Sequence, residues 1–326
     1  MSVPSDPVPA QATPAGLAGE LRYFLTALGY FTRVPLPGWL ARWVGFEPHY
    51  LHAAARYFPL VGLLVGGAGA LVTWGAMPWW PPGVAVLLGM AATLLLTGAF
   101  HEDGLADCVD AFGGAWQRED VLRIMHDSRI GAFGAIALVV ALLLKWQLLV
   151  AIAGRGGLMV LLAVMVAAHA ASRAMAVSYL ATLTYVRPEG KAKPVAQRLA
   201  GAGLVFALLC GLVPLWLVSP WFCAAAAGAL LVLRLLLGRY FVRRIGGYTG
   251  DCLGMAQQCA EILLCLVAAA PVFVSLTSRA AGRSIISTCT TTLGECWAAS
   301  PLTISVGPIT ELRYWGSSVA VITALE

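Results

Sequence analysis

The chain has 326 residues, of which 60% are hydrophobic and 11% are charged, whereas a soluble domain carries about 25% charged residues. This composition excludes an ordinary soluble protein and predicts an all-α, polytopic transmembrane helical bundle. The net charge of +5 and the pI near 8.8 do not indicate a nucleic-acid binder, because the basic residues are spread over many loops instead of forming one patch. We therefore expect a lipid bilayer, and no nucleic acid, around the chain.

In chain order, residues 1–18 are rich in Pro and Ala, which predicts a disordered N-terminus without a cleavable signal. Residues 21–30 are too few to cross a bilayer in the usual way and are interpreted as an interfacial or re-entrant helix, with a further short span as the alternative. A membrane-embedded domain is expected over 19–277, and the tail at 278–326 receives no role. About seven spans are expected in this domain, at 57–76, 83–100, 132–153, 157–183, 202–218, 221–237 and 259–277.

The predicted spans assign the loops to two sides of the membrane. The Trp- and Pro-rich cluster at 78–82 predicts a tight turn at one face. Seven alternating spans place the N-terminal segment and the loops at 101–131, 184–201 and 238–258 on the other side. Most arginines and lysines lie in the N-terminal segment and in these three loops. Only Arg155 lies in the short turns on the opposite side of the membrane. The positive-inside rule therefore predicts that the long polar loops are cytoplasmic.

The first of these loops is unusually acidic. Seven of the sixteen acidic residues lie between Glu102 and Asp127, and the spacing of Asp103, Asp107 and Asp110 places them on one face of a helix. Carboxylate oxygens suit Mg²⁺, which proteins hold with a few carboxylates and substrate phosphates, and Mn²⁺ would suit them nearly as well. The pattern predicts metal-assisted phosphoryl transfer, with a solvated acidic loop as the alternative.

The same loop continues with arginine, histidine and glycine residues. Arginine side chains match phosphate oxygens, and glycine lets the backbone come close to a ligand. Arg123 and Arg129 are therefore candidates for phosphate binding, although the positive-inside rule alone would also place them here. His126 is a candidate general base, or else a structural histidine.

Motifs in chain order resemble the cobalamin synthase family. The most specific motif runs from His101 through Asp107 and Asp110 to Gly113-Gly114 and resumes at 125–134. Shorter motifs agree with it along the chain, from about residue 20 to about residue 275, whereas the tail matches nothing in the family. They are FTRVPLP at 31–37, ARYFPLVG at 55–62, RPEG at 187–190 and GGYTGDCLG at 246–254.

This resemblance implies a transferase of the bacterial inner membrane. Its substrates would be adenosylcobinamide-GDP and α-ribazole or α-ribazole 5′-phosphate, and its products adenosylcobalamin or adenosylcobalamin 5′-phosphate and GMP. A ribose hydroxyl would attack the phosphorus attached to cobinamide, so that GMP leaves. The preferred form of ribazole stays open, and so does assembly into a homo-oligomer.

Under this hypothesis Asp103, Asp107 and Asp110 bind Mg²⁺, with Glu102 as a further ligand or base. Asp251 completes the metal site or binds a ribose hydroxyl, with a helix N-cap as the alternative. The catalytic candidates are Glu102, Asp103, Asp107, Asp110 and His126, and the substrate-binding candidates are Arg123, Asp127, Arg129, Arg187, Lys191 and Asp251.

Lys145 and Arg173 are basic residues that lie within predicted spans. Charges inside a membrane are costly and usually face the bundle interior or a cavity. Arg173, with His169 one turn earlier, is expected to point into a substrate cavity, whereas Lys145 is equally compatible with snorkelling to the membrane surface. Neither residue is predicted to be catalytic.

Two other functions compete with the transferase. CDP-alcohol phosphotransferases also use an Asp-Gly-x-x-Ala core, but Asp107 occupies the position where that pattern has an arginine. A secondary transporter would have charged residues in mid-span at matching positions of two repeated halves. The acidic residues here are instead concentrated in one loop.

Overall fold

The computed structural model describes residues 16–47, 50–127, 129–187, 199 and 201–270, together with the backbone of two strands near the C-terminus. The chain divides into two compact units, Met1–Thr277 and Ser278–Glu326. The first helix begins at Gly16, so residues 16–18 of the predicted disordered start are helical, and residues 1–15 lie outside the described part.

The described elements of the first unit are helices, which confirms the predicted all-α membrane bundle for this unit. Proline stands in the first turn of three of the long helices, where its missing N–H has no helical partner in any case. The helices are α1 (Gly16–Phe31), α2 (Gly38–Val44), α3 (Tyr50–Ala54), η1 (Ala55–Tyr57, a 3₁₀ turn), α4 (Phe58–Ala76), α5 (Pro82–Thr97), α6 (Phe100–Gly114), α7 (Arg118–Ile124), α8 (Ala132–Thr182), α9 (Gly201–Val218), α10 (Pro220–Ile245) and α11 (Gly250–Ala269).

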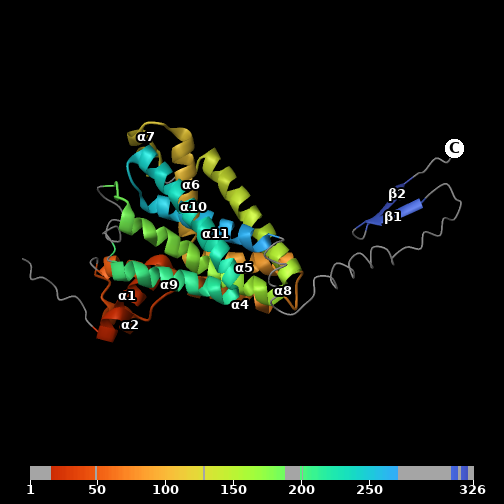
Figure 1. Cartoon of the computed structure of the whole chain (residues 1–326), viewed down its shortest axis with the longest axis horizontal. Helices are drawn as coiled ribbons and strands as arrows, with labels where there is room; N and C mark the ends of the chain where they lie inside the picture. Colours follow the sequence, from red (N-terminus) through yellow and green to blue (C-terminus); the bar gives the residue numbers. More distant parts are fainter. Residues whose placement is uncertain are drawn as a thin grey trace, which may run out of the picture. The chain divides into compact units, whose positions relative to one another are not determined.

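The number of membrane spans depends on how two bent elements are counted. Within the described residues, five helices are long and apolar enough to cross a membrane, or six if the bent pair α5–α6 is one span. The 51-residue helix α8 contains a non-helical residue, Gly157, with φ 79° and ψ 174°. Each leg of α8 is longer than the about 20 residues that one crossing needs. Separating the legs raises the count to the predicted seven, and Figure 1 shows α8 doubling back on itself.

The predicted span at 83–100 corresponds to α5, which ends at Thr97 and is followed by a sharp bend. The axes of α5 and α6 differ by 85°, and the two residues between them, Gly98 and Ala99, both have left-handed backbone angles, with φ 65° and 55°. Arg33 packs into this bend: its backbone N–H donates to Leu96 O at 2.7 Å, and a Cβ on Gly98 would lie 1.9 Å from Arg33 Nε. The early Thr-Arg motif therefore fixes the direction in which α6 leaves α5.

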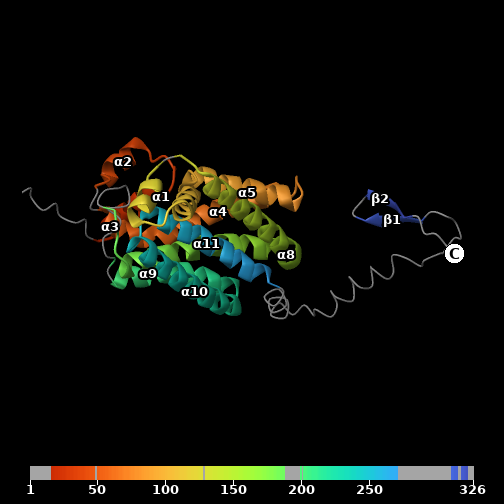
Figure 2. The same cartoon turned by 90° about the horizontal axis from the view of Figure 1, so that it is seen from above.

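The long helices pack in three groups. In Figure 2, α9 and α10 lie on one side of the bundle and α4 and α5 on the other. Helix α8 contacts both groups, and α11 contacts α8, α6 and α10. The α4–α8 contact is close because α4 presents glycines: a Cβ on Gly62 would lie 2.4 Å from His169 O, and one on Gly66 2.9 Å from Val166 Cα. Such small-residue contacts replace the hydrophobic effect as the cause of helix association in lipid.

The loop expected at 238–258 is much shorter than predicted. Helix α10 continues to Ile245, and α11 begins at Gly250, so only four residues connect them. Gly246 ends α10 with φ 80°, a left-handed conformation that glycine adopts without strain. The short connection places the GGYTGDCLG motif at the junction of the two helices and brings Asp251 into the first turn of α11.

The second unit contains two strands, so the all-α prediction does not extend to the tail. Strand β1 (Thr310–Tyr314) pairs with β2 (Ser317–Val321) in an antiparallel hairpin, with Thr310 opposite Val321 and Tyr314 opposite Ser317. No function is assigned to this unit.

Candidate functional site

The candidate site lies where α6 crosses α11. A Cβ on Gly104 would lie 2.9 Å from Asp251 O and 3.2 Å from Gly254 Cα. The two backbones can approach this closely only because both helices have glycine at the crossing. Cys108 in the signature motif of α6 and Cys252 in the later glycine-rich motif are 144 residues apart in the sequence. Because the two helices cross here, the two motifs form one surface.

Three carboxylates and one guanidinium gather beside this crossing. We call Asp103, Asp107 and Asp251 the acidic cluster. Asp107 is half-buried and within electrostatic range of both other members and of Arg187. Arg187 Nη2 lies 2.9 Å from Asp251 Oδ2. The cluster keeps an excess of negative charge, because one cation faces three acids.

A short stretch of extended backbone positions Arg187. Val186 N–H donates to Tyr248 O at 3.0 Å, and Tyr248 N–H donates to Thr184 O at 2.9 Å. A Cβ on Gly247 would lie only 2.1 Å from Thr184 O, so the pairing requires glycine at this position. The guanidinium of Arg187 also donates to Met125 O at 3.0 Å, which ties the RPEG motif to the end of α7.

Thr249, and not Asp251, caps α11. The Thr249 Oγ1 accepts a hydrogen bond from Cys252 N–H at 3.3 Å, as an N-cap residue does. The alternative interpretation of Asp251 as the N-cap is therefore wrong. Its carboxylate is left to pair with Arg187.

Asp110 makes different contacts from its neighbours on α6. Its carboxylate accepts hydrogen bonds from Gly131 N–H at 2.7 Å and from Gly134 N–H at 2.8 Å, and so satisfies the first amides of α8. A Cβ on either glycine would lie within 2.4 Å of this carboxylate. The contacts explain the Gly-x-x-Gly spacing at the start of α8 and occupy both oxygens of Asp110.

Glu102 points into the bundle and away from the acidic cluster. It is buried, and its Oε1 accepts a hydrogen bond from Gln258 Nε2 at 2.8 Å. Within the described residues no group of three or more Asp, Glu, His or Cys side chains is close enough to hold a metal ion alone. The predicted set of Glu102, Asp103, Asp107 and Asp110 is therefore not assembled into a ready metal site.

The basic candidates of the loop between α6 and α8 are paired with nearby acids. Arg123 Nη2 contacts Asp120 Oδ1 at 2.6 Å, and Arg129 contacts Asp127 through Nε at 3.0 Å and Nη2 at 2.6 Å. The Arg129 guanidinium holds the pKa of Asp127 at about 2, so this pair is ionised at neutral pH. His126 is exposed at the end of α7. The candidate Lys191 lies outside the described residues.

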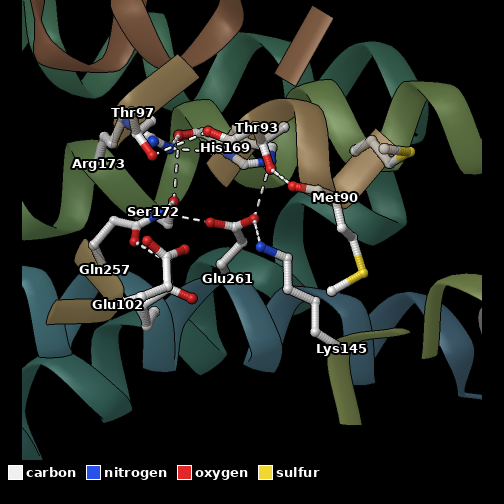
Figure 3. Close-up of polar contacts among 12 residues, drawn as sticks. Met90, Thr93, Thr97, Glu102, Lys145, His169, Ser172, Arg173, Gln257 and Glu261 are labelled. Atoms are coloured by element: carbon white, nitrogen blue, oxygen red, sulfur yellow. Dashed lines mark hydrogen bonds and ion pairs between the residues drawn. The ribbon is translucent and has the colours of Figure 1, made fainter. Parts of the chain in front are cut away.

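A buried polar network lies beneath the acidic cluster. Figure 3 shows Glu261 of α11 at its centre. Glu261 is 1% exposed, and its carboxylate meets Lys145 Nζ at 2.5 Å, His169 Nε2 at 3.1 Å and Gln257 Nε2 at 2.5 Å. Lys145 therefore pairs inside the bundle, and the snorkelling interpretation of this residue is wrong.

Arg173 extends the network toward α4. Its Nη1 donates to His169 O at 2.9 Å and lies 3.1 Å from His169 Nδ1, and its guanidinium lies over the Phe58 ring at 5.5 Å. Arg173 is 1% exposed. Its direct contacts are thus protein groups of α4 and α8.

The network reaches the candidate site through two glutamines. Gln257 donates to Ser172 Oγ at 3.1 Å, and Gln258 donates to both Gln257 Oε1 and Glu102 Oε1 at 2.8 Å. Because Glu102 directly precedes Asp103, these bonds fix the first turn of α6. Sequence reasoning did not select Gln257, Gln258 or Glu261. The sequence did contain a signal for Glu261, because it is a lone acid inside an apolar stretch. Lys145, a lone base inside another apolar stretch, needed an acidic partner.

Comparisons with known proteins identify the family. The family model for cobalamin-5-phosphate synthase (CobS) matches residues 23–269. The chain belongs to this family. The matched region contains α6, α11 and every motif described above, whereas the C-terminal unit lies outside it.

Curated relatives of this chain carry the name adenosylcobinamide-GDP ribazoletransferase. The protein of Ralstonia pickettii is 60% identical over 240 residues, which cover 73% of this chain and 91% of that protein. The protein of Ralstonia nicotianae is 59% identical over 251 residues, covering 77% and 95%. The protein of Shewanella oneidensis is 48% identical over 247 residues, covering 75% and 92%. No solved structure matches the chain.

Membership of the cobalamin-5-phosphate synthase family decides between the functions that the sequence left open. The phospholipid transferase and the transporter are not favoured, because the matched family is the one that the motifs resemble.

Proposed function

We propose that this chain joins adenosylcobinamide-GDP to α-ribazole or α-ribazole 5′-phosphate, forming adenosylcobalamin or its 5′-phosphate and releasing GMP. The family match over residues 23–269 carries this proposal, and the name of the relatives states the same reaction for those proteins. The reaction takes place at the acidic cluster between α6 and α11.

The residues of the cluster fit a divalent cation. Asp103, Asp107 and Asp251 concentrate negative charge against Arg187 alone, and such a surface would repel a pyrophosphate unless a cation lay between them. Because the described residues hold no complete ligand set, two carboxylates would share Mg²⁺ with substrate phosphates, as is usual for this ion. When bound, Mg²⁺ would neutralise the charge that develops on the pyrophosphate.

The chain's own residues position the reacting groups. A ribose hydroxyl oxygen forms a bond to the phosphorus attached to cobinamide, the bond from this phosphorus to the bridging oxygen breaks, and GMP leaves with that oxygen. The hydroxyl proton passes to a carboxylate of the cluster or to water. Arg187, held by Asp251 and Met125 O, is placed to contact a phosphate oxygen. Displacement of this kind depends mainly on such positioning.

The distribution of basic residues supports a cytoplasmic site in the bacterial inner membrane. Arg187, Arg243 and Arg244 lie at the end of the bundle that carries the cluster, and Arg244 Nη2 donates to Phe112 O at the end of α6. At the other end, Arg155 Nη1 donates to Ala269 O, the last residue of α11. By the positive-inside rule, the end with more arginines faces the cytoplasm.

The reaction can be tested with the purified chain in nanodiscs. Adenosylcobinamide-GDP, α-ribazole and Mg²⁺ are supplied, and GMP and the joined corrinoid are quantified by mass spectrometry. We expect equal amounts of the two products, neither of them formed when α-ribazole is left out or when EDTA removes the metal. GMP formed without joined corrinoid, or a joined lipid product from a CDP-alcohol and diacylglycerol, would refute the proposal.

A further inference from the structure

Two adjoining hollows on the outer surface of α8, α9 and α10 are not used by the proposed reaction. One lies between these three helices and has a volume of about 350 Å³. The other has a similar volume, about 370 Å³, and lies between α8 and the end of α10. Thr182 and Arg234 line both hollows, so the two form one continuous groove.

The two parts of the groove differ in chemistry. The hollow between α8, α9 and α10 is apolar over most of its length, and its polar groups, Ser178, Thr182 and Arg234, are at one end. The hollow between α8 and the end of α10 is cationic, because Arg239 and Arg243 line it together with Arg234. The apolar part is lined by residues that include Ala171, Met175, Leu204, Leu208, Leu212 and Leu231.

Arg234 is held at the junction by neutral groups. Its Nε donates to Ser178 Oγ at 2.7 Å, its Nη2 donates to Thr182 Oγ1 at 2.6 Å, and its guanidinium lies over the Tyr179 ring at 5.3 Å. These contacts orient the side chain and leave its charge uncompensated. Over the described ranges of the chain, no carboxylate pairs with Arg234, Arg239 or Arg243.

An uncompensated arginine in an apolar membrane helix needs an explanation, because charges within a bilayer are costly. Arg234 lies within the candidate span Pro220–Ile245, at the end of the groove where Arg239 and Arg243 also lie. An anion at the junction would compensate all three arginines together, and arginine forks match phosphate oxygens better than they match any neutral group.

The length of the apolar part indicates what the anion is attached to. Along α8 the lining residues run from Ala171 to Thr182, which corresponds to about 16 Å of helix. One leaflet contributes about half of the 30 Å hydrocarbon core. A groove of this length, cationic at the end near the membrane surface and apolar toward the bilayer centre, has the polarity of one phospholipid in one leaflet.

We propose that the groove between α8, α9 and α10 is a binding site for an anionic phospholipid, with its phosphate at Arg234, Arg239 and Arg243 and an acyl chain against Leu204, Leu208 and Leu231. The lipid fills the seam through which α9 and α10 pack on the second leg of α8. This site is separate from the acidic cluster, so it does not depend on the reaction proposed above.

Native mass spectrometry of the protein released from nanodiscs tests this site. The nanodiscs contain equal amounts of phosphatidylglycerol and phosphatidylcholine, and we expect wild type to retain phosphatidylglycerol preferentially. Each of Arg239→Gln and Arg243→Gln should lower this retention about fivefold, the effect expected for one arginine near an anionic membrane surface. Both side chains are exposed, so neither change should alter folding. Arg42→Gln, on the exposed face of the separate helix α2, is the control for loss of one interfacial charge.

A second pair of variants tests the apolar part of the groove. Ala227→Phe fills the hollow that Ala227 lines and should release the bound lipid, whereas Ala225→Phe, on the exposed side of α10, should not. The proposal is overturned if wild type retains both lipids equally, or if the groove variants and their controls behave alike. Displacement of phosphatidylglycerol by millimolar inorganic phosphate would also overturn it, because the arginines would then form a site for soluble phosphate.

Discussion

Acidic side chains within three turns of α6 have different partners. Asp107 faces Asp103 and Asp251 in the acidic cluster, Asp110 accepts two amides of α8, and Glu102 bonds to Gln258 inside the bundle. Among the described contacts, Asp103 and Asp107 are the carboxylates of this stretch of α6 that no hydrogen bond or ion pair of the fold uses. Removing one charge there should affect the reaction more than it affects stability.

Asp107→Asn is therefore expected to lower the rate of GMP release by at least about a hundredfold, the usual cost of losing one group that stabilises transition-state charge. The thermal unfolding midpoint should stay close to that of wild type, because Asn has the same shape and relieves repulsion within the cluster. Asp120→Asn is the matched control, since Asp120 is an exposed acid paired with Arg123 on α7. Equal activity of the two variants would show that Asp107 is not part of the reaction site.

Helical spacing identified the acidic face of α6 but not the partner of each acid. The separations of Asp103, Asp107 and Asp110 do place them along one helix, as predicted. Two carboxylates of this face nevertheless meet different neighbours, because α11 passes beside Asp107 while the start of α8 passes beside Asp110. The positions of these crossings depend on tertiary packing, which cannot be predicted from the periodicity of one segment.

At the scale of helices, the glycine contact between α6 and α11 sets the distance from Asp103 and Asp107 on α6 to Asp251 on α11. A Cβ on Gly104 would be forced to within 2.9 Å of Asp251 O, so any side chain there must push the helices apart. Asp103 and Asp107 would then move away from Asp251.

Gly104→Ala should consequently lower kcat by up to about a hundredfold, since a displacement near 1 Å can have an effect of this size. The matched control is Gly67→Ala on α4, where a Cβ meets nothing within 4 Å. That change should preserve activity and stabilise the helix by about 0.5–1 kcal/mol. Steady-state kinetics and thermal unfolding of both variants make the comparison. An unchanged kcat in Gly104→Ala would contradict the arrangement described for the crossing.

The Glu261 network joins α8 to α11 and, through Gln258, to α6. Removing Glu261 alone would leave the buried ammonium of Lys145 without its partner. A buried charge left in this way is strongly destabilising, whereas replacing both partners by apolar groups is often tolerated.

Glu261→Leu should therefore lower the free energy of unfolding by about 3–5 kcal/mol, and adding Lys145→Leu should recover much of the loss. Denaturant unfolding in mixed micelles measures wild type, both single variants and the double variant. Additive effects of the two substitutions would show that the ion pair is not formed.

Hydropathy located the apolar segments but not their directions. The apolar stretch at 83–100 contains α5, but hydropathy does not show that the left-handed pair Gly98 and Ala99 turns α6 by 85° from α5. In α8, the expected division into spans at 132–153 and 157–183 agrees with the break at Gly157, because Arg155 and three glycines interrupt the apolar run there. The bend between α5 and α6 depends on the backbone conformation of two residues, to which an average over a window of residues is insensitive.

For the whole molecule, the account requires that the end bearing the acidic cluster faces the cytoplasm. Trp116, in the connection after α6, and Trp79, in the turn after α4, are both highly exposed, at 86% and 77%. They lie at opposite ends of the bundle, because α4 runs from the cluster side to the turn that contains Trp79.

A membrane-impermeant maleimide should label Trp116→Cys only in inverted vesicles and Trp79→Cys only in right-side-out vesicles. The parent protein in both preparations gives the background from its native cysteines, of which Cys108, Cys252 and Cys265 are buried. The opposite labelling pattern would place the cluster on the outer side of the membrane and contradict the positive-inside assignment.

The most direct test of the proposed reaction follows the phosphorus attached to cobinamide. Adenosylcobinamide-GDP is labelled with radioactive phosphorus at that atom only and incubated with α-ribazole, Mg²⁺ and the purified chain in nanodiscs. The account predicts that the label appears in the joined corrinoid and that the released GMP is unlabelled. Label in the released nucleotide or in inorganic phosphate, with no labelled joined product, would contradict the transfer of the cobinamide phosphate to ribazole.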